Sequence, residues 1–234
     1  MKFSLVLVAF LFSTGFATGR KNKNFGGKKG KTTSTAPTTT EPTTTEPTTA
    51  EPTTAEPATA EPTTNGIEVL DSGEQADILF MREEEKLARD VYLTLFGTYN
   101  HRVFSNIAKA EQKHMNAIET LINTYNLDDP VVSDKVGVFT DRTLQGLYID
   151  LVTEGSKSLL DALMVGALIE EIDIKDLEEA IVDSDQSDID LVYDNLLEGS
   201  YNHLRAFVRS IERQGAQYTA QLLTQEEVDE ILNN

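Results

Sequence analysis

The chain of 234 residues contains no cysteine, which excludes disulfides, thiolate metal sites and cysteine nucleophiles together. It also lacks the Asn-x-Ser/Thr signal for N-glycosylation. Beyond the first residues, no stretch is apolar enough to span a bilayer, and no run alternates with the period of a strand. A Gly-rich phosphate loop and a Ser-His-Asp signature are absent too. These absences favour an all-α domain held by its apolar core, with no membrane span in the mature chain.

The first 64 residues have the composition of a leader rather than of a folded domain. Residues 1–19 combine a basic residue, a short apolar run and then small residues, as in a secretory signal. Residues 20–31 form a basic arm with six Lys or Arg and no acid. Residues 32–64 repeat a Glu-Pro-Thr-Thr-x unit, which is typical of a disordered, O-glycosylated stalk. We therefore expect a secreted, extracellular protein.

The rest of the chain is strongly acidic. From Thr64 onward it carries 13 basic and 34 acidic residues, a net charge of −21. Such a surface repels nucleic acid and anionic lipid and attracts cations. Metal ions are therefore the expected partners, and nucleic acid is not.

Apolar residues recur at helical spacing throughout the predicted domain, residues 66–234. The four long helices are expected at 72–96, 101–125, 156–172 and 187–213, with shorter ones at 141–154, 175–182 and after the Thr224–Glu227 capping box. A long connection separates the second long helix from the third. The prediction is thus a ferritin-like four-helix bundle with a long crossover between helices two and three, plus short extra helices.

Glu111 and His114 interrupt the apolar stripe of the second long helix. Three residues apart, they lie on one face of a helix and point where their apolar neighbours point. A carboxylate in that position is costly to dehydrate unless a cation or a donor compensates it. An inward Glu-x-x-His is also how four-helix bundles hold iron or manganese. The pair therefore predicts a buried metal site.

Two other helices offer the carboxylates that such a site needs. On the first helix we favour Glu85, with Glu84 as the alternate, although Glu85 could instead pair with Arg89 on the surface. On the third helix we favour Glu170, with Glu171 as the alternate. The opposing interpretation places both of these residues in solvent at a helix end.

The fourth helix departs from the expected pattern. His203 lies on its inward stripe, but the position three residues earlier is Ser200 rather than an acid. A hydroxyl is a poor ligand for a hard divalent ion, so the site is short by one carboxylate. A lone inward histidine is also compatible with a hydrogen-bonded core residue.

Four motifs resemble a ferritin-like domain of unassigned function that is common in bacteria and archaea. They are MREEEKLARDVY at 81–92, AEQKHM at 110–115, VGALIEEIDIKDLEEAI at 165–181 and GSYNHLRAFVRSIE at 199–212. The resemblance implies a four-helix fold with an iron-type site. On the matching residues, that site would consist of Glu85 (with Tyr92 seven residues later), Glu111, His114, Glu170 and His203.

The sequence leaves two functions open. The first is a secreted ferritin-like protein that binds iron or manganese in the bundle core; if it is an enzyme, it is an oxidoreductase of ferroxidase or peroxidase type. The missing acid weighs against catalysis. The second is a non-catalytic acidic protein of an extracellular matrix, such as that of a mineralised tissue, which binds calcium diffusely and contacts matrix components.

Overall fold

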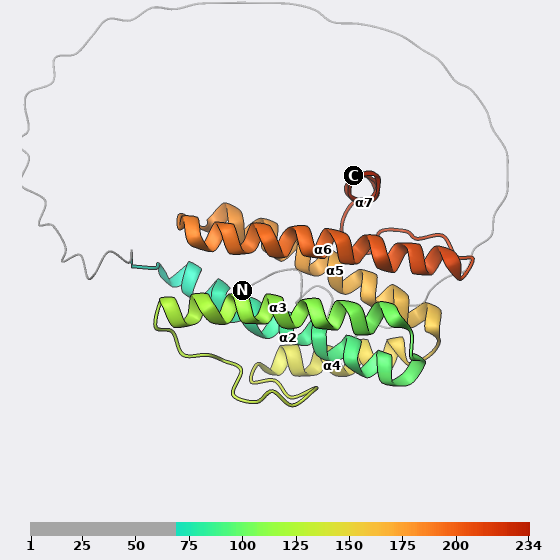
Figure 1. Cartoon of the computed structure of the whole chain (residues 1–234), viewed down its shortest axis with the longest axis horizontal. Helices are drawn as coiled ribbons and strands as arrows, with labels where there is room; N and C mark the ends of the chain where they lie inside the picture. Colours follow the sequence, from blue (N-terminus) through green and yellow to red (C-terminus); the bar gives the residue numbers. More distant parts are fainter. Residues whose placement is uncertain (1–68) are drawn as a thin grey trace, which may run out of the picture. The chain divides into compact units, whose positions relative to one another are not determined.

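The computed structural model describes residues 69–234, and this part of the chain consists of helices and connections without a strand (Figure 1). The helices are α2 (Ser72–Tyr99), α3 (Arg102–Thr124), α4 (Arg142–Gly155), α5 (Leu159–Asp183), α6 (Ser187–Arg213) and α7 (Gln225–Asn233). The predicted all-α class is therefore confirmed. None of these six helices is long and apolar enough to cross a bilayer. The predicted signal segment, basic arm and stalk lie outside the described residues.

Four long helices form the bundle, as predicted. α2 packs along α3, and α5 packs along α6, each pair joined by a short connection (Figure 1). The long connection between α3 and α5 carries α4, which packs against both α2 and α5. The expected crossover between the second and third long helices is therefore present.

Local signals in the sequence explain where the helices begin. Asp71 and Glu74 form a capping box at the start of α2, and Thr224 and Glu227 form the predicted one at the start of α7. Such caps satisfy backbone N–H groups that have no partner within the helix, each contributing about 1 kcal/mol. α2 ends at Tyr99, and its C-cap residue Asn100 has a φ of 50°, the left-handed conformation that often closes a helix.

The third long helix differs from its prediction. We expected one helix over 156–172 and a separate short one over 175–182, but α5 is continuous from Leu159 to Asp183. No glycine or proline lies between Ile172 and Lys175, where the break was expected, and Asp173 and Ile174 are both buried. Asp173, which lies at the expected break, therefore faces the inside of the bundle rather than a loop.

The apolar core consists of two clusters with a polar layer between them. On α3, Ile107 and Ala108 belong to one cluster and Ile118 to the other, while Glu111 and His114 lie between them. The first cluster includes Leu87, Val91, Phe104, Ile169, Leu204 and Phe207, and the second includes Ile78, Met81, Leu121, Leu177, Tyr193 and Leu196. Every long helix thus contributes to both clusters, and the polar layer crosses the middle of the bundle.

Candidate metal centre

The five residues predicted as metal ligands converge in the polar layer. Glu85 comes from α2, Glu111 and His114 from α3, Glu170 from α5 and His203 from α6. Glu85, Glu111 and Glu170 are each 1% exposed. The alternative that placed Glu170 and Glu171 in solvent is therefore wrong. That the five residues bind a metal stays a prediction.

Glu111 lies at the centre of the cluster because each of its two oxygens faces a different histidine. Its Oε2 is 2.9 Å from His114 Nδ1, and its Oε1 is 3.0 Å from His203 Nδ1. Glu85 Oε2 lies 3.2 Å from His114 Nδ1, and Glu170 Oε2 lies 3.3 Å from His203 Nδ1. The result is two Glu-Glu-His triads that share Glu111.

Each triad has the dimensions of a metal site. In both, one potential ligand atom from each residue lies within 4.8 Å of the other two. The two imidazole rings stack with centroids 5.5 Å apart and present Nδ1 to the carboxylates. Two nearby sites with a common carboxylate are thus available.

The histidines are protonated in the metal-free cluster. Burial alone would lower the pKa of His114, but the Glu85 and Glu111 carboxylates beside it raise that pKa to about 12. Burial would also lower the pKa of His203, which Glu111 and Glu170 raise to about 11. Two imidazolium ions therefore balance part of the buried negative charge. A metal ion at Nδ1 would have to displace that proton.

The carboxylates have unequal proton affinities. Burial would raise the pKa of Glu111, yet the two histidines hold it at about 2, so this group stays ionised. Burial raises the pKa of Glu170 to about 7 in spite of His203. Burial also raises the pKa of Glu85, which His114 opposes. The shared carboxylate is thus the permanent anion of the cluster.

Tyr92 orients Glu170 from the apolar side. Its hydroxyl donates to Glu170 Oε1 at 2.5 Å, with the carbonyl oxygen of Gly166 at 3.3 Å. Gly166 permits this packing because a Cβ there would lie 2.3 Å from the Phe207 ring, which contacts Tyr92 with centroids 5.2 Å apart. The tyrosine seven residues after Glu85 therefore belongs to the site's supporting shell.

Gly199 on α6 makes room for His114. A Cβ at position 199 would lie 2.6 Å from His114 Nε2 and 2.7 Å from Cε1, so the imidazole would have to move. Alanine usually stabilises a helix interior over glycine by about 0.5–1 kcal/mol. We expect Gly199→Ala to leave stability almost unchanged while it weakens metal binding about 10–100-fold, as changes that disturb ligand orientation do.

Isothermal titration with Mn²⁺ and a thermal melt would check this prediction. Gly97→Ala on α2 is the matched control, since nothing lies within 4 Å of its added methyl group. It should stabilise the helix without changing metal affinity. Unchanged affinity in Gly199→Ala would show that the position of the His114 ring does not matter.

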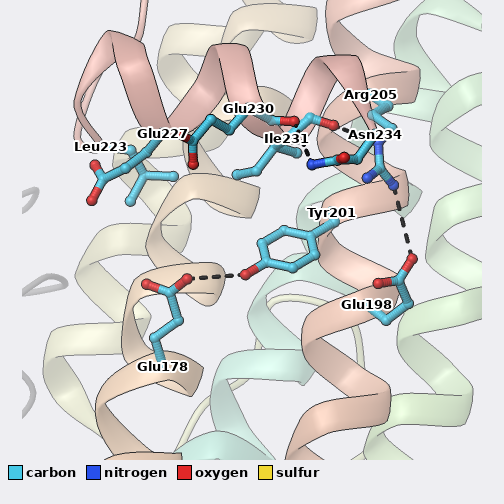
Figure 2. Close-up of a pocket in the computed structure, with 9 residues that line it drawn as sticks. All are labelled: Glu178, Glu198, Tyr201, Arg205, Leu223, Glu227, Glu230, Ile231 and Asn234. Carbon is cyan, nitrogen blue, oxygen red and sulfur yellow. Dashed lines mark hydrogen bonds and ion pairs between the residues drawn. The ribbon is translucent and has the colours of Figure 1, made fainter.

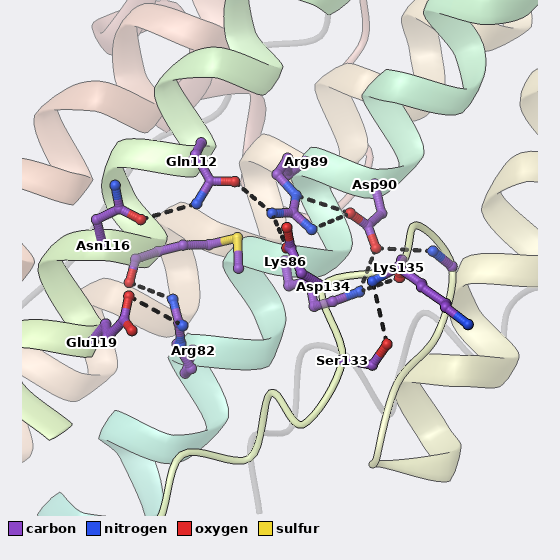
Figure 3. Close-up of polar contacts among 12 residues, drawn as sticks. Arg82, Lys86, Arg89, Asp90, Gln112, Asn116, Glu119, Ser133, Asp134 and Lys135 are labelled. Atoms are coloured by element: carbon purple, nitrogen blue, oxygen red, sulfur yellow. Dashed lines mark hydrogen bonds and ion pairs between the residues drawn. The ribbon is translucent and has the colours of Figure 1, made fainter.

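Between Met81 and Tyr92, the polar side of α2 is buried as completely as its apolar side. Every residue from Met81 to Tyr92 is buried, because the connection between α3 and α4 covers the charged face (Figure 3). Arg82 pairs with Asp129 at 3.0 Å, and Lys86 donates to the carbonyl oxygen of Lys135 at 3.0 Å. These basic residues of α2 therefore hold the connection between α3 and α4 against the bundle.

The surface pairing considered for Glu85 is not observed. Arg89 contacts Asp90 at 2.8 Å, Asp134 at 2.6 Å and Gln112 at 2.5 Å instead (Figure 3). This arrangement leaves Glu85 facing His114.

The two alternates lie outside the triads. Glu84 is buried beside Asp176 of α5. Burial raises the pKa of Glu84 well above its usual value, and Asp176 raises it further. Glu171 faces away from the cluster and accepts hydrogen bonds from the chain between α6 and α7.

Asp173 is the polar-layer residue that the sequence reasoning missed. It is 5% exposed, and its Oδ2 accepts a hydrogen bond from Ser200 on α6. It lies one helical turn after Glu170, so the Glu-x-x-Asp spacing on α5 could have indicated it. The expected break near residue 173 hid that signal.

A pocket of about 360 Å³ lies between α5, α6 and α7, apart from the cluster residues (Figure 2). Tyr201 crosses it and donates to Glu178 at 3.0 Å, while Arg205 donates to the carbonyl oxygen of Ile231 at 2.7 Å. Four of its lining residues are glutamates, namely Glu178, Glu198, Glu227 and Glu230. None of the triad residues lines this pocket.

Comparison with known proteins places the chain in a family. Residues 74–234 match the family described as an uncharacterized protein domain, DUF2202, and the chain belongs to it. It is 50% identical over 161 residues to the uncharacterized protein MJ0754 of Methanocaldococcus jannaschii. The aligned region covers 69% of this chain and 87% of that protein. The crystal structure of hypothetical protein MJ0754 superimposes with a TM-score of 0.71 at 46% identity, covering 74% of this chain and 98% of that one.

Proposed function

We propose that this DUF2202 domain binds two iron or manganese ions in its core, with the Glu111 carboxylate shared between them. The observation that carries the proposal is the position of Glu111, whose two oxygens each face one histidine at 2.9 and 3.0 Å. Each ion would have one histidine, one further glutamate and one oxygen of Glu111.

The donor set suits these metals. Imidazole nitrogen and carboxylate oxygen are the ligands that iron and manganese take in helix bundles. Glu85 Oε1 is buried without a hydrogen-bond donor in the described part of the chain, and the two oxygens of Glu111 face the imidazole Nδ1 atoms of His114 and His203. Buried oxygens of this kind are costly unless a cation compensates them. The cluster is therefore better explained as a set of ligands than as core polar contacts.

The protein's own part in metal binding is to hold and release protons. His114 and His203 would each give up the Nδ1 proton, so metal affinity should rise with pH. Tyr92 keeps Glu170 aimed at the centre through its 2.5 Å hydrogen bond. Bound iron or manganese would supply one-electron redox chemistry, the basis of a ferroxidase or peroxidase activity.

The decisive test is the metal content of the full chain produced in medium supplemented with iron, manganese and zinc. We expect about two ions per chain in the unaltered protein and none in Glu111→Gln, which removes the shared anion but keeps the shape. Glu198→Gln on exposed α6 surface is the matched control, since its side chain is 68% exposed. Equal metal content in Glu111→Gln and the unaltered chain would contradict the proposal.

The acidic surface favours calcium binding as a second candidate function. A net charge of −21 from residue 64 onward attracts divalent ions without a defined site, as expected for a secreted matrix protein on a stalk. Many calcium ions should bind in this way, each of them weakly, and Glu111→Gln should not change this binding. Calcium titration of the same two proteins separates this function from a specific centre.

A further inference from the structure

The cluster of five residues is one carboxylate short of a complete two-metal centre. Bundles of this kind use four carboxylates and two histidines, one Glu from each of two helices and Glu-x-x-His from the other two. Here α6 carries Ser200 where the fourth carboxylate is expected. If the centre holds two ions, another element has to supply that ligand.

Asp173 is a buried carboxylate beside the position where the missing acid is expected. It lies on α5 next to Ser200, the residue that replaces the acid, and the Ser200 hydroxyl donates to its Oδ2. The other oxygen, Oδ1, is buried and has no hydrogen-bond partner among the described residues. An unpartnered carboxylate oxygen at this depth is destabilising unless a cation meets it.

The pKa of Asp173 responds to the carboxylates of the triads. After burial, the strongest influences that raise its pKa come from Glu85, Glu170 and Glu111, the three carboxylates of the triads. No basic side chain is among its main influences, whereas Lys86 and Arg89 on the outer face of α2 both pair with Asp90. Asp173 is therefore within electrostatic reach of the triads.

Ser200 is suited to position this carboxylate. Its hydroxyl is fully buried and also contacts the carbonyl oxygen of Leu196 at 3.1 Å, so its place on α6 is fixed. The neighbouring Gly199 lies against His114. The Ser200–Asp173 contact thus occurs at the level of the Glu85–Glu111–His114 triad.

We propose that Asp173 is the fourth carboxylate ligand of the centre, supplied by α5 in place of the acid that α6 lacks, and that Ser200 is its positioning residue. This inference rests on the proposed function. It goes beyond it by moving one ligand to a different helix and giving the serine a role. The α5 sequence then contributes a Glu170-x-x-Asp173 pair, and α6 contributes only His203.

The experiment compares metal content and Mn²⁺ affinity of the full chain in four proteins: unaltered, Asp173→Asn, Ser200→Ala and Asp173→Asn/Ser200→Glu. We expect Asp173→Asn to weaken at least one ion about 100-fold and Ser200→Ala to weaken it about 10-fold, the upper and lower ends of the range for residues that support a metal. The double variant returns an acid to α6 and should regain two ions per chain.

Two matched controls exclude general damage to the bundle. Asp176→Asn changes another buried α5 carboxylate one turn away, which lies beside Glu84. Ser210→Ala removes another buried α6 hydroxyl, which contacts the carbonyl oxygen of Ala206 at 2.8 Å. Both should keep two ions with unchanged affinity.

Thermal unfolding without metal supplies a readout that a structural role would not produce. A residue that only held the fold together would destabilise the metal-free protein when changed. In the metal-free core, burial and the triad carboxylates raise the pKa of Asp173 and disfavour its ionised form, so Asp173→Asn should melt at the same or a higher temperature. It should also lose most of the metal-induced shift in Tm.

The outcomes separate the two proposals. Two ions held by Asp173→Asn with unchanged affinity would overturn the role of Asp173 and leave the proposed function intact. A marked loss of metal-free stability in Asp173→Asn would also overturn it. No metal in the unaltered chain would overturn both.

Discussion

The metal-free protein should lose several kcal/mol of unfolding free energy between pH 5 and pH 8. Three groups of the cluster hold protons in the folded state that the unfolded chain releases. The pKa of His114 rises from 6.5 to about 12, that of His203 from 6.5 to about 11 and that of Glu170 from 4.5 to about 7. For each such group, the free energy of unfolding falls by about 1.4 kcal/mol per pH unit over the range in which the unfolded chain has released the proton and the folded chain still holds it.

The direction of the effect is the same for all three groups. The stabilisation by the two histidines is complete below pH 6.5 and is lost as pH rises toward their folded pKa values. Glu170 becomes destabilising from pH 4.5 upward until its folded pKa of about 7. Glu111, with a pKa of about 2, has the opposite sign, but its contribution is lost only below pH 4.5.

Urea unfolding of the metal-free protein at several pH values would measure this slope. His114→Gln/His203→Gln is the informative variant, because it removes both proton-binding imidazoles and should flatten the slope above pH 6.5. Saturating Mn²⁺ should flatten it as well, since bound metal replaces the protons. Stability that stays level or increases from pH 5 to pH 8 would contradict the protonated cluster.

Glu171→Ala should destabilise the protein by about 3–5 kcal/mol, because several buried donors lose a charged acceptor and each hydrogen bond to a charged group contributes about 1.5–3 kcal/mol. Glu171 is fully buried and accepts hydrogen bonds from the backbone N–H groups of Gln221, Leu222 and Leu223 at 3.0, 2.5 and 2.8 Å. The Tyr218 hydroxyl donates to it too. Without the carboxylate these donors lose their partner, and the chain that leads to α7 is released.

Guanidinium unfolding and metal analysis together check this prediction. Glu179→Ala is the control on the same helix, since its side chain is 43% exposed and pairs with Lys175 only at 3.8 Å. It should change stability by less than about 0.5 kcal/mol. Metal content per folded chain should be normal in both variants. A loss below about 1 kcal/mol in Glu171→Ala would mean that the carboxylate does not hold this segment.

Helical periodicity was sufficient to predict the bundle, since each long helix has an apolar face and the capping residues mark several ends. It failed at Asp173, because a polar residue between apolar ones indicates a loop as readily as an inward-facing layer. Contacts with the neighbouring helix determine which of the two arrangements forms, and here the Ser200 hydroxyl of α6 makes such a contact. Sequence spacing contains no information on such contacts between distant helices.

The candidate site was predictable to the extent that each residue interrupts an apolar stripe. Glu111 and His114 were clear for this reason. The choice between Glu84 and Glu85 was not, because the whole segment from Met81 to Tyr92 is buried and burial alone does not distinguish the faces of α2. The charged face is covered by the connection at 128–141, whose packing depends on long-range ion pairs such as Arg82–Asp129.

The bundle consists of two helix pairs, and an ion on the shared Glu111 carboxylate would link them. The α2–α3 pair contributes Glu85, Glu111 and His114, and the α5–α6 pair contributes Glu170 and His203. Neither hairpin has the ligands of both triads, so an ion held between Glu111 and His203 would bind the two hairpins to each other. In a chain without cysteine, this coordination would act as a reversible cross-link, one that forms only after both hairpins have docked.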